Sequence, residues 1–351
     1  MKKFLSMILA VLLLCGGILV GSIAEGQYEY TAKGKNAEIT LIKGRGEIEI
    51  PAELDGKKVT SIYYYAFNGN NNVTKVTLPE GLQKIDMMAF ANSGSLKSIN
   101  IPDSLTVIGN GAFSSCSALE SIEISPYHKT FGVCKDVLFQ KKNMTLLRYF
   151  GKEKDTYEVF WGIKCIGEYA FNCSEMSTII LPDSLTEIAF CGFIGCEKLK
   201  NISIPNGVKN IGGQAFCFCE SLETITIPAS VNKIGPGVFN YCDKLTEIKV
   251  DPANKKYEVQ GLLLIDKGKK MIVSSTSAIE GTVQIPDGIR EIDNSAFQGC
   301  KKMIELIIPD SVKKIGVNAL WSCEQVLVKG HAGSYAQKYC EQNNIRFEVI
   351  E

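Results

Sequence analysis

Histidine is scarce in this chain of 351 residues, and its scarcity limits the catalytic chemistry that the chain can carry. Only His128 and His331 are present. A thiol nucleophile with a histidine base could be assembled from Cys134 and His128, but an ordinary structural role explains both residues. The chain has neither a phosphate-binding loop nor a dinucleotide-binding fingerprint. We therefore expect no catalytic residue, no cofactor and no enzymatic activity.

An excess of charge of either sign is absent as well. The chain has 38 lysine and arginine residues against 38 aspartate and glutamate residues. This balance points neither to a nucleic-acid partner nor to a membrane surface. Apolar residues make up 45% of the chain and charged residues 22%, which is typical of a chain that folds.

The N-terminus holds the one long hydrophobic run. Two lysines precede an apolar stretch over residues 4–14, and the small residues Ser22 and Ala24 suit positions −3 and −1 of a cleavage site. These features predict a secretory signal peptide, residues 1–24, and hence a secreted or cell-surface protein. An uncleaved membrane anchor is the alternative, because residues 18–20 prolong the apolar stretch. No later run approaches the ~20 apolar residues that span a membrane, so we expect no membrane insertion after cleavage.

An internal repeat dominates the rest of the chain. An apolar residue followed by proline recurs after an alternating run, and Pro182, Pro205 and Pro228 are spaced 23 residues apart. The working consensus is L-x-x-I-x-I-P-x-S-V-x-x-I-G-x-x-A-F-x-x-C. The apolar-proline pairs are Ile50-Pro51, Leu78-Pro79, Ile101-Pro102, Leu181-Pro182, Ile204-Pro205, Ile227-Pro228, Ile285-Pro286 and Ile308-Pro309.

Each position of the repeat has a physical interpretation. Ile225 and Ile227 alternate with threonine, so both point to one face of a short strand, which Pro228 ends. Phe239 fills the middle of the coil, and Cys242 is a small buried hydrophobe. One such unit buries too little apolar surface to offset the conformational entropy of ordering its backbone, so the units must stack into a solenoid.

These residues resemble the BspA-like class of bacterial leucine-rich repeat proteins, over about residues 37–328. The resemblance implies a right-handed leucine-rich repeat solenoid of about nine repeats, rich in β-strand, with short helical turns on the far side. It also implies a secreted or cell-surface protein that acts as a binder or adhesin rather than as an enzyme.

Two segments, 125–160 and 251–284, interrupt the 23-residue step and match each other. Each has a lysine-rich turn between two apolar runs, which predicts a β-hairpin. We interpret both segments as enlarged structural units, and a lateral binding ridge is the functional alternative.

The whole mature chain, 25–351, is expected to be a single leucine-rich repeat domain. Residues 25–50 alternate and predict an N-terminal β cap, followed by repeats over 51–328. The C-terminal cap, 329–351, is predicted as a helix that begins after Ser334 and a final strand.

Six cysteines occupy the last consensus position, where we expect buried thiols. They are Cys116, Cys196, Cys219, Cys242, Cys300 and Cys323. Outside that column, Cys191 and Cys217 are candidates for a disulfide between adjacent coils. Cys217 and Cys219 form a C-x-C pair of the kind that can bind zinc, but the repeat already explains Cys219, so we predict no metal site.

The outward-facing residues of the repeat strands form the candidate binding surface, because repeat solenoids bind through such extended faces. The first predicted column is Lys75, Ser98, Ser121, Thr178, Asn201, Thr224, Glu247 and Glu305. The second is Thr77, Asn100, Glu123, Ile180, Ser203, Thr226, Lys249 and Ile307. Serine and threonine also suit strands that are merely exposed to solvent, so a simple solvated sheet is the alternative.

Three functional hypotheses follow. The first is a non-catalytic binding or adhesion protein that recognises an extracellular protein or glycan. The second is a structural surface or matrix component that associates with itself. The third is a thiol-dependent hydrolase built on Cys134.

Overall fold

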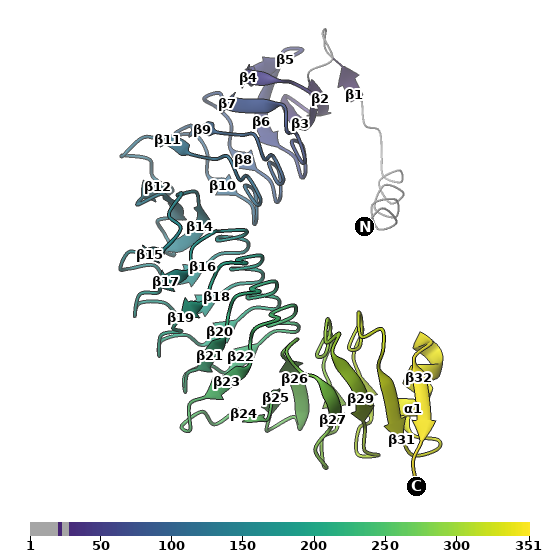
Figure 1. Ribbon diagram of the computed structural model, residues 1–351. Coiled ribbons are helices and arrows are strands. Elements are labelled where there is room, and N and C mark those ends of the chain that lie inside the picture. Colours follow the sequence, from purple (N-terminus) through teal and green to yellow (C-terminus); the bar gives the residue numbers. More distant parts are fainter. Residues whose placement is uncertain (1–19, 23–27) are drawn as a thin grey trace.

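The computed structural model, which describes residues 20–22 and 28–351, is a curved β-solenoid of about 14 turns (Figure 1). The leucine-rich repeat architecture expected from the sequence is confirmed. The solenoid has more turns than the nine repeats counted from the consensus, because the predicted caps and enlarged units contribute coils of their own. The predicted signal peptide lies outside the described residues, apart from β1 (Val20–Ser22), which pairs with β2 (Tyr28–Lys33). Cleavage after Ala24 therefore stays a prediction. No helix in the described part of the chain has the length and apolarity to cross a bilayer.

Each turn contributes a first strand that carries the alternating apolar residues. Equivalent first strands pair in parallel from coil to coil, and their labels follow the outer side of the arc in Figure 1. The first strands are β4 (Gly46–Glu49), β7 (Val73–Thr77), β9 (Ser98–Ile101), β11 (Ser121–Ile124), β15 (Thr156–Glu158), β17 (Thr178–Ile180), β19 (Asn201–Ile202), β21 (Thr224–Ile227), β23 (Glu247–Val250), β27 (Gly281–Gln284), β29 (Met303–Ile307), β31 (Leu327–Gly330) and β32 (Arg346–Val349).

A second strand, only two residues long in all but the first of them, returns across the coil and aligns an inward-pointing isoleucine with its counterpart in the next, as Ile188 pairs with Ile211. These second strands are β6 (Lys57–Ile62), β8 (Lys84–Ile85), β10 (Val107–Ile108), β16 (Cys165–Ile166), β18 (Glu187–Ile188), β20 (Asn210–Ile211), β22 (Lys233–Ile234), β28 (Glu291–Ile292) and β30 (Lys314–Ile315). The short strand β5 (Glu53–Leu54) pairs antiparallel with β6.

The inner side of the arc is built from turns that carry the Ala-Phe pair (Figure 1). The resemblance implied short helical turns on this side, and none of these turns in the described residues extends into a helix. Two positions in each turn are left-handed, one directly before the alanine and one two residues after the phenylalanine. Gln214 (φ 54°) and Phe218 (φ 60°) illustrate them. Such residues interrupt a right-handed helix. The turns instead bond to the next coil, as when Phe193 N donates to Ala215 O at 2.8 Å.

A ladder of phenylalanine rings fills the solenoid. Phe171, Phe193, Phe216 and Phe239 stack with centroids 5.1, 5.3 and 6.0 Å apart. All four are fully buried. Phe113 is buried in the same way and stacks on the ring before it. Neighbouring coils thus share one apolar interior, which is the stacking predicted from the repeat.

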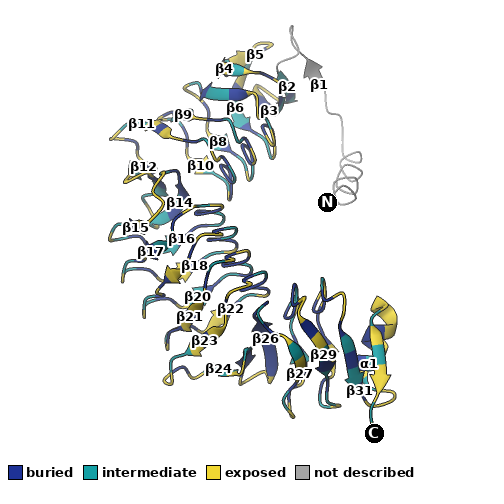
Figure 2. Ribbon diagram, viewed as in Figure 1, coloured by how far each residue is buried: buried dark blue, intermediate teal, exposed yellow. Residues whose placement is uncertain are grey.

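The two enlarged units are three-stranded antiparallel meanders, which confirms the hairpins predicted in both. The first contains β12 (Phe131–Cys134), β13 (Val137–Gln140) and β14 (Thr145–Tyr149), and the second contains β24 (Tyr257–Gln260), β25 (Leu263–Asp266) and β26 (Met271–Ser275). Strand β26 is buried along its whole length (dark blue in Figure 2). The meanders divide the apolar core into three clusters, Tyr30–Phe150, Val137–Val273 and Leu263–Cys340.

Both ends of the described solenoid carry caps of the predicted kind. At the N-terminal end, β2 pairs antiparallel with β3 (Asn36–Ile42). At the other end, the Ser334 hydroxyl accepts a hydrogen bond from Gln337 N at 3.2 Å and begins α1 (Tyr335–Asn343). Asn344 ends this helix in the left-handed conformation, and β32 then pairs with β31.

Candidate functional site

The strand register brings the two predicted columns into line on the outer face. Lys75 pairs with Ser98, which pairs with Ser121, while Thr226 pairs with Lys249. Every predicted residue of both columns is exposed or partly exposed, and the isoleucine, valine or leucine between them on each strand is buried. The geometry required of a binding surface is therefore present, and the binding role of these residues stays a prediction.

The outer face is not one continuous sheet. It is divided into four segments, β4–β11, β15–β19, β21–β23 and β27–β32. The enlarged units separate the first segment from the second and the third from the fourth. Between β19 and β21 the hydrogen-bonded ladder is interrupted without an insertion, and β19 is only two residues long.

The register also adds outer-face residues that the consensus missed. They lie on strands whose turns lack the Ile-Pro signature or belong to an enlarged unit or a cap. The alternation of apolar and polar residues along these strands was the signal that could have identified them. In the strand register, each lies opposite a predicted residue or opposite a residue that itself pairs with one. They are Glu47, Glu49, Thr156, Glu158, Thr282, Gln284, Lys329, Arg346 and Glu348.

Several predicted residues make contacts within the protein. The Asn100 side chain accepts from Leu78 N at 2.6 Å and donates to Leu78 O at 2.9 Å, so it extends the strand ladder. Lys249 pairs with Glu247 at 2.9 Å, and Glu305 pairs with Lys329 at 2.8 Å. The C-terminal part of the face is therefore occupied by its own ion pairs.

A shallow hollow of about 350 Å³ lies where the ladder lapses between β19 and β21. Five residues of the predicted columns line it, and they are Thr178, Ile180, Asn201, Ser203 and Thr224. Ile180 is 48% exposed, which is high for a large apolar side chain. The lining thus combines hydroxyl and amide groups with one apolar patch, and Asp183 is its single charged residue.

The histidine of the hypothetical Cys134–His128 pair is committed to the backbone. His128 is buried, and its Nδ1 accepts hydrogen bonds from the N–H groups of Thr130 and Phe131, both at 3.1 Å. Because Nδ1 acts as an acceptor, the ring hydrogen is on Nε2, and this N–H donates a hydrogen bond to Pro102 O at 3.1 Å. Neither ring nitrogen is left to act as a base for the Cys134 thiol.

The cysteines of the described chain are free thiols, and the candidate disulfide between Cys191 and Cys217 is not formed. Burial raises the pKa of both thiols to about 12, so they are protonated at neutral pH. Over residues 28–351, histidine, cysteine and carboxylate side chains form no group of three that could hold a metal ion.

The model for the BspA type leucine rich repeat region matches residues 47–150, 164–260 and 274–345 in six copies, which is well over half of the sequence. The chain belongs to the BspA-type leucine-rich repeat family. No curated protein matches it.

Solved structures of bacterial leucine-rich repeat proteins are similar to this BspA-type chain. A leucine rich cell surface protein from Faecalibacterium prausnitzii A2-165 is 25% identical, with 88% of this chain and 76% of that chain covered and a TM-score of 0.43. A leucine-rich repeat protein from Bacteroides ovatus ATCC 8483 is 20% identical over 97% of this chain and 100% of that chain, with a TM-score of 0.39. The pneumococcal vaccine antigen PcpA is 17% identical over 95% and 99%, with a TM-score of 0.38.

Proposed function

We propose that this protein is a secreted or cell-surface, non-catalytic binding or adhesion protein that recognises an extracellular protein or glycan. Its outer face makes the contact, and the hollow between β17 and β21 is the centre of that contact. The observation that supports this proposal is the coincidence of the hollow with five residues of the predicted columns. Membership of the BspA-type repeat family supports a repeat protein that binds rather than one that catalyses.

The side chains of the hollow indicate the chemistry of the ligand. Hydroxyl groups on Thr178, Ser203 and Thr224 and the amide of Asn201 offer donors and acceptors without net charge. Exposed Ile180 supplies apolar contact area beside them. An uncharged group with many hydroxyls or amides, such as a neutral sugar or a polar peptide segment, fits this surface.

A binding screen with a matched control tests the proposal. The chain is immobilised and exposed to extracellular-matrix proteins and polysaccharides, and every ligand found is titrated against Asn201→Ala/Thr224→Ala and against Asn232→Ala. Asn232 is exposed but does not line the hollow. We expect the double variant to bind about tenfold more weakly or worse, and the control to bind normally. A ligand whose affinity both variants leave unchanged would show that the hollow is not the contact centre.

A further inference from the structure

Arg148 on β14 is a buried cation without an anionic partner. It is 6% exposed, and its Nη1 donates to Asn172 O at 3.2 Å. Its Nε is buried and has no hydrogen-bond partner. No carboxylate of the described chain lies within ion-pair distance of the guanidinium. Buried charges are normally paired with an opposite charge, so an unpaired buried guanidinium is a candidate for binding an anionic ligand.

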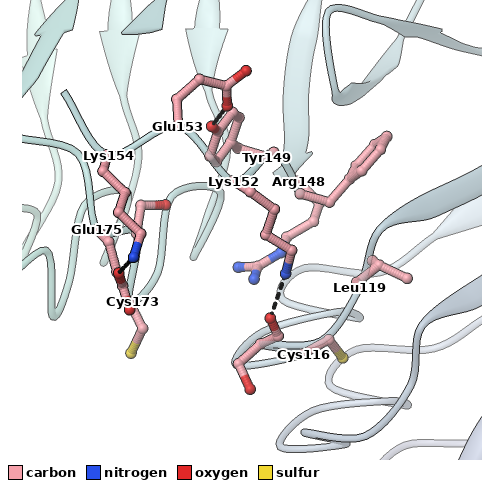
Figure 3. Close-up of a pocket in the computed structure, with 13 residues that line it drawn as sticks. Cys116, Leu119, Arg148, Tyr149, Lys152, Glu153, Lys154, Cys173 and Glu175 are labelled. Atoms are coloured by element: carbon pink, nitrogen blue, oxygen red, sulfur yellow. Dashed lines mark hydrogen bonds and ion pairs between the residues drawn. The ribbon is translucent and has the colours of Figure 1, made fainter. Parts of the chain in front are cut away.

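The guanidinium faces a pocket of about 280 Å³ at the junction between the first enlarged unit and the coils on either side of it. Figure 3 shows its nitrogen atoms directed into the space between Cys116 and Cys173. The pocket is accessible from solvent, because Lys152, Lys154 and Glu175 in its lining are exposed.

The charges that line this pocket do not balance. Lys154 lies 3.7 Å from Glu175, and the Glu153 carboxylate accepts a hydrogen bond from the Tyr149 hydroxyl. Lys152 donates to the backbone oxygen of Ser117 at 2.7 Å. Three cationic side chains therefore share the lining with two carboxylates, and both carboxylates contact groups other than Arg148. The adjacent thiol adds no negative charge, because burial raises the pKa of Cys116 to about 11.

The second enlarged unit shows that this fold does not require an arginine here. Arg148 pairs with Leu138 in the first meander, and the equivalent pair in the second is Ser274 with Leu264. Ser274 satisfies its own hydroxyl by donating to Ser275 O at 3.1 Å. The same meander thus forms around a small neutral residue, so folding alone does not explain the charge at position 148.

We propose that this pocket binds an oxyanion, a carboxylate, sulfate or phosphate group, through the guanidinium of Arg148. The planar guanidinium matches two oxygens of such a group in a bidentate pair. The bound anion supplies the negative charge that the lining lacks. This site is separate from the hollow on β17–β21, so it gives the protein a second and chemically different point of recognition.

Titrations at fixed ionic strength test the site. Acetate, glucuronate, sulfate and phosphate each replace sodium chloride, and calorimetry and Tm report binding. We expect a saturable rise in Tm with at least one anion, and binding about tenfold weaker or lost in Arg148→Met. Arg290→Met, which removes an exposed arginine, should bind like the native chain. Stronger binding of glucuronate than of acetate would indicate that the natural ligand is an acidic sugar. A preference for sulfate or phosphate would indicate a free inorganic ion or its ester.

A spectroscopic measurement on the native chain keeps the site testable if Arg148→Met does not fold. The chain has four arginines, and the other three, Arg45, Arg290 and Arg346, are exposed and can be assigned by substitution. With ¹⁵N-arginine labelling, the remaining Nε–H resonance should shift on addition of the anion that binds. No response to any of the four anions, or equal binding by Arg148→Met, would overturn the proposal.

Discussion

At the scale of single residues, the repeat cysteine has a second role besides filling space. Cys219 Sγ donates to Phe193 O at 3.3 Å, and Cys242 Sγ donates to Phe216 O at 3.0 Å. Each thiol thereby adds a second donor to a carbonyl in the previous coil, since Phe193 O also accepts from Cys196 N at 3.3 Å and Phe216 O from Cys219 N at 3.2 Å. Near the N-terminal end Ser93 occupies this position, and its hydroxyl donates to Phe67 O at 2.9 Å. The consensus position therefore selects a small side chain that can donate a hydrogen bond.

Two substitutions at Cys219 separate donation from packing. We expect Cys219→Ala to lower the free energy of unfolding by about 1–3 kcal/mol, because the Phe193 carbonyl loses one of its two donors and a small void forms. Cys219→Ser keeps a donor and should cost less. Urea unfolding measures both. An equal loss of stability in the two variants would mean that packing of the sulfur atom, and not its hydrogen bond, accounts for the stabilisation.

The buried thiols also predict the response of the fold to alkali. Burial raises the pKa of Cys165, Cys191 and Cys217 from 9.0 to about 12. Above pH 9.0 the unfolded chain loses these protons while the folded chain keeps them, so stability falls as the pH rises toward 12. Thermal unfolding between pH 8 and pH 11 should show a falling Tm. The slope should be smaller in Cys191→Ala/Cys217→Ala, and an unchanged slope would contradict the assignment.

At the scale of elements, one buried polar side chain in each enlarged unit forms hydrogen bonds both within that unit and to the preceding coil. Asn254 Oδ1 accepts from Lys256 N and Tyr257 N at 2.9 and 2.8 Å, while its Nδ2 donates to Pro228 O at 2.9 Å. His128 makes the same three kinds of contact in the first unit. Histidine and asparagine therefore make equivalent contacts in the two units, since each side chain offers one acceptor and one donor.

This equivalence predicts a tolerated exchange. His128→Asn should retain most of the stability, because an amide can reproduce both sets of hydrogen bonds. His128→Ala should lower the free energy of unfolding by about 2 kcal/mol or more, because it leaves buried backbone groups unpaired. Chemical denaturation compares the two. If asparagine proved as harmful as alanine, the shape of the imidazole rather than its hydrogen bonds would hold the unit.

At the scale of the whole molecule, stability is shared between neighbouring coils rather than concentrated in one centre. The three core clusters follow one another along the chain, and the ring stacking joins each coil to the next. A quasi-linear protein of this kind should tolerate the loss of a whole repeat, because the coils on either side present equivalent faces.

Deletion of residues 206–228 tests that expectation, since it removes one 23-residue step and joins Pro205 to the next consensus segment. We expect the shortened chain to fold with an unchanged β-type circular dichroism spectrum and a modestly lower Tm. Deletion of 206–217 removes about half a coil and puts the apolar positions out of step, so it should not fold cooperatively. Equal behaviour of the two deletions would argue against coil-by-coil stacking.

Features that depend on local or periodic patterns could be predicted from the amino-acid sequence alone. The 23-residue step, the inward isoleucines and the buried phenylalanine and cysteine columns all follow from side chains that must share an interior with the next coil. The two hairpins and the Ser334 helix cap were also predictable, because their signals lie within a few residues.

Features that depend on contacts between coils became known only from the three-dimensional structure. The lapse of the ladder at β19 and the hollow beside it, the use of the Asn100 amide by Leu78 and the burial of Arg148 are of this kind. Partners such as Asn100 and Leu78 are 22 residues apart in sequence, and the repeat pattern is the same whether or not they bond. The hydrogen bonds and the burial of a side chain depend on the particular residues of the coil stacked against it, and the consensus does not specify those residues.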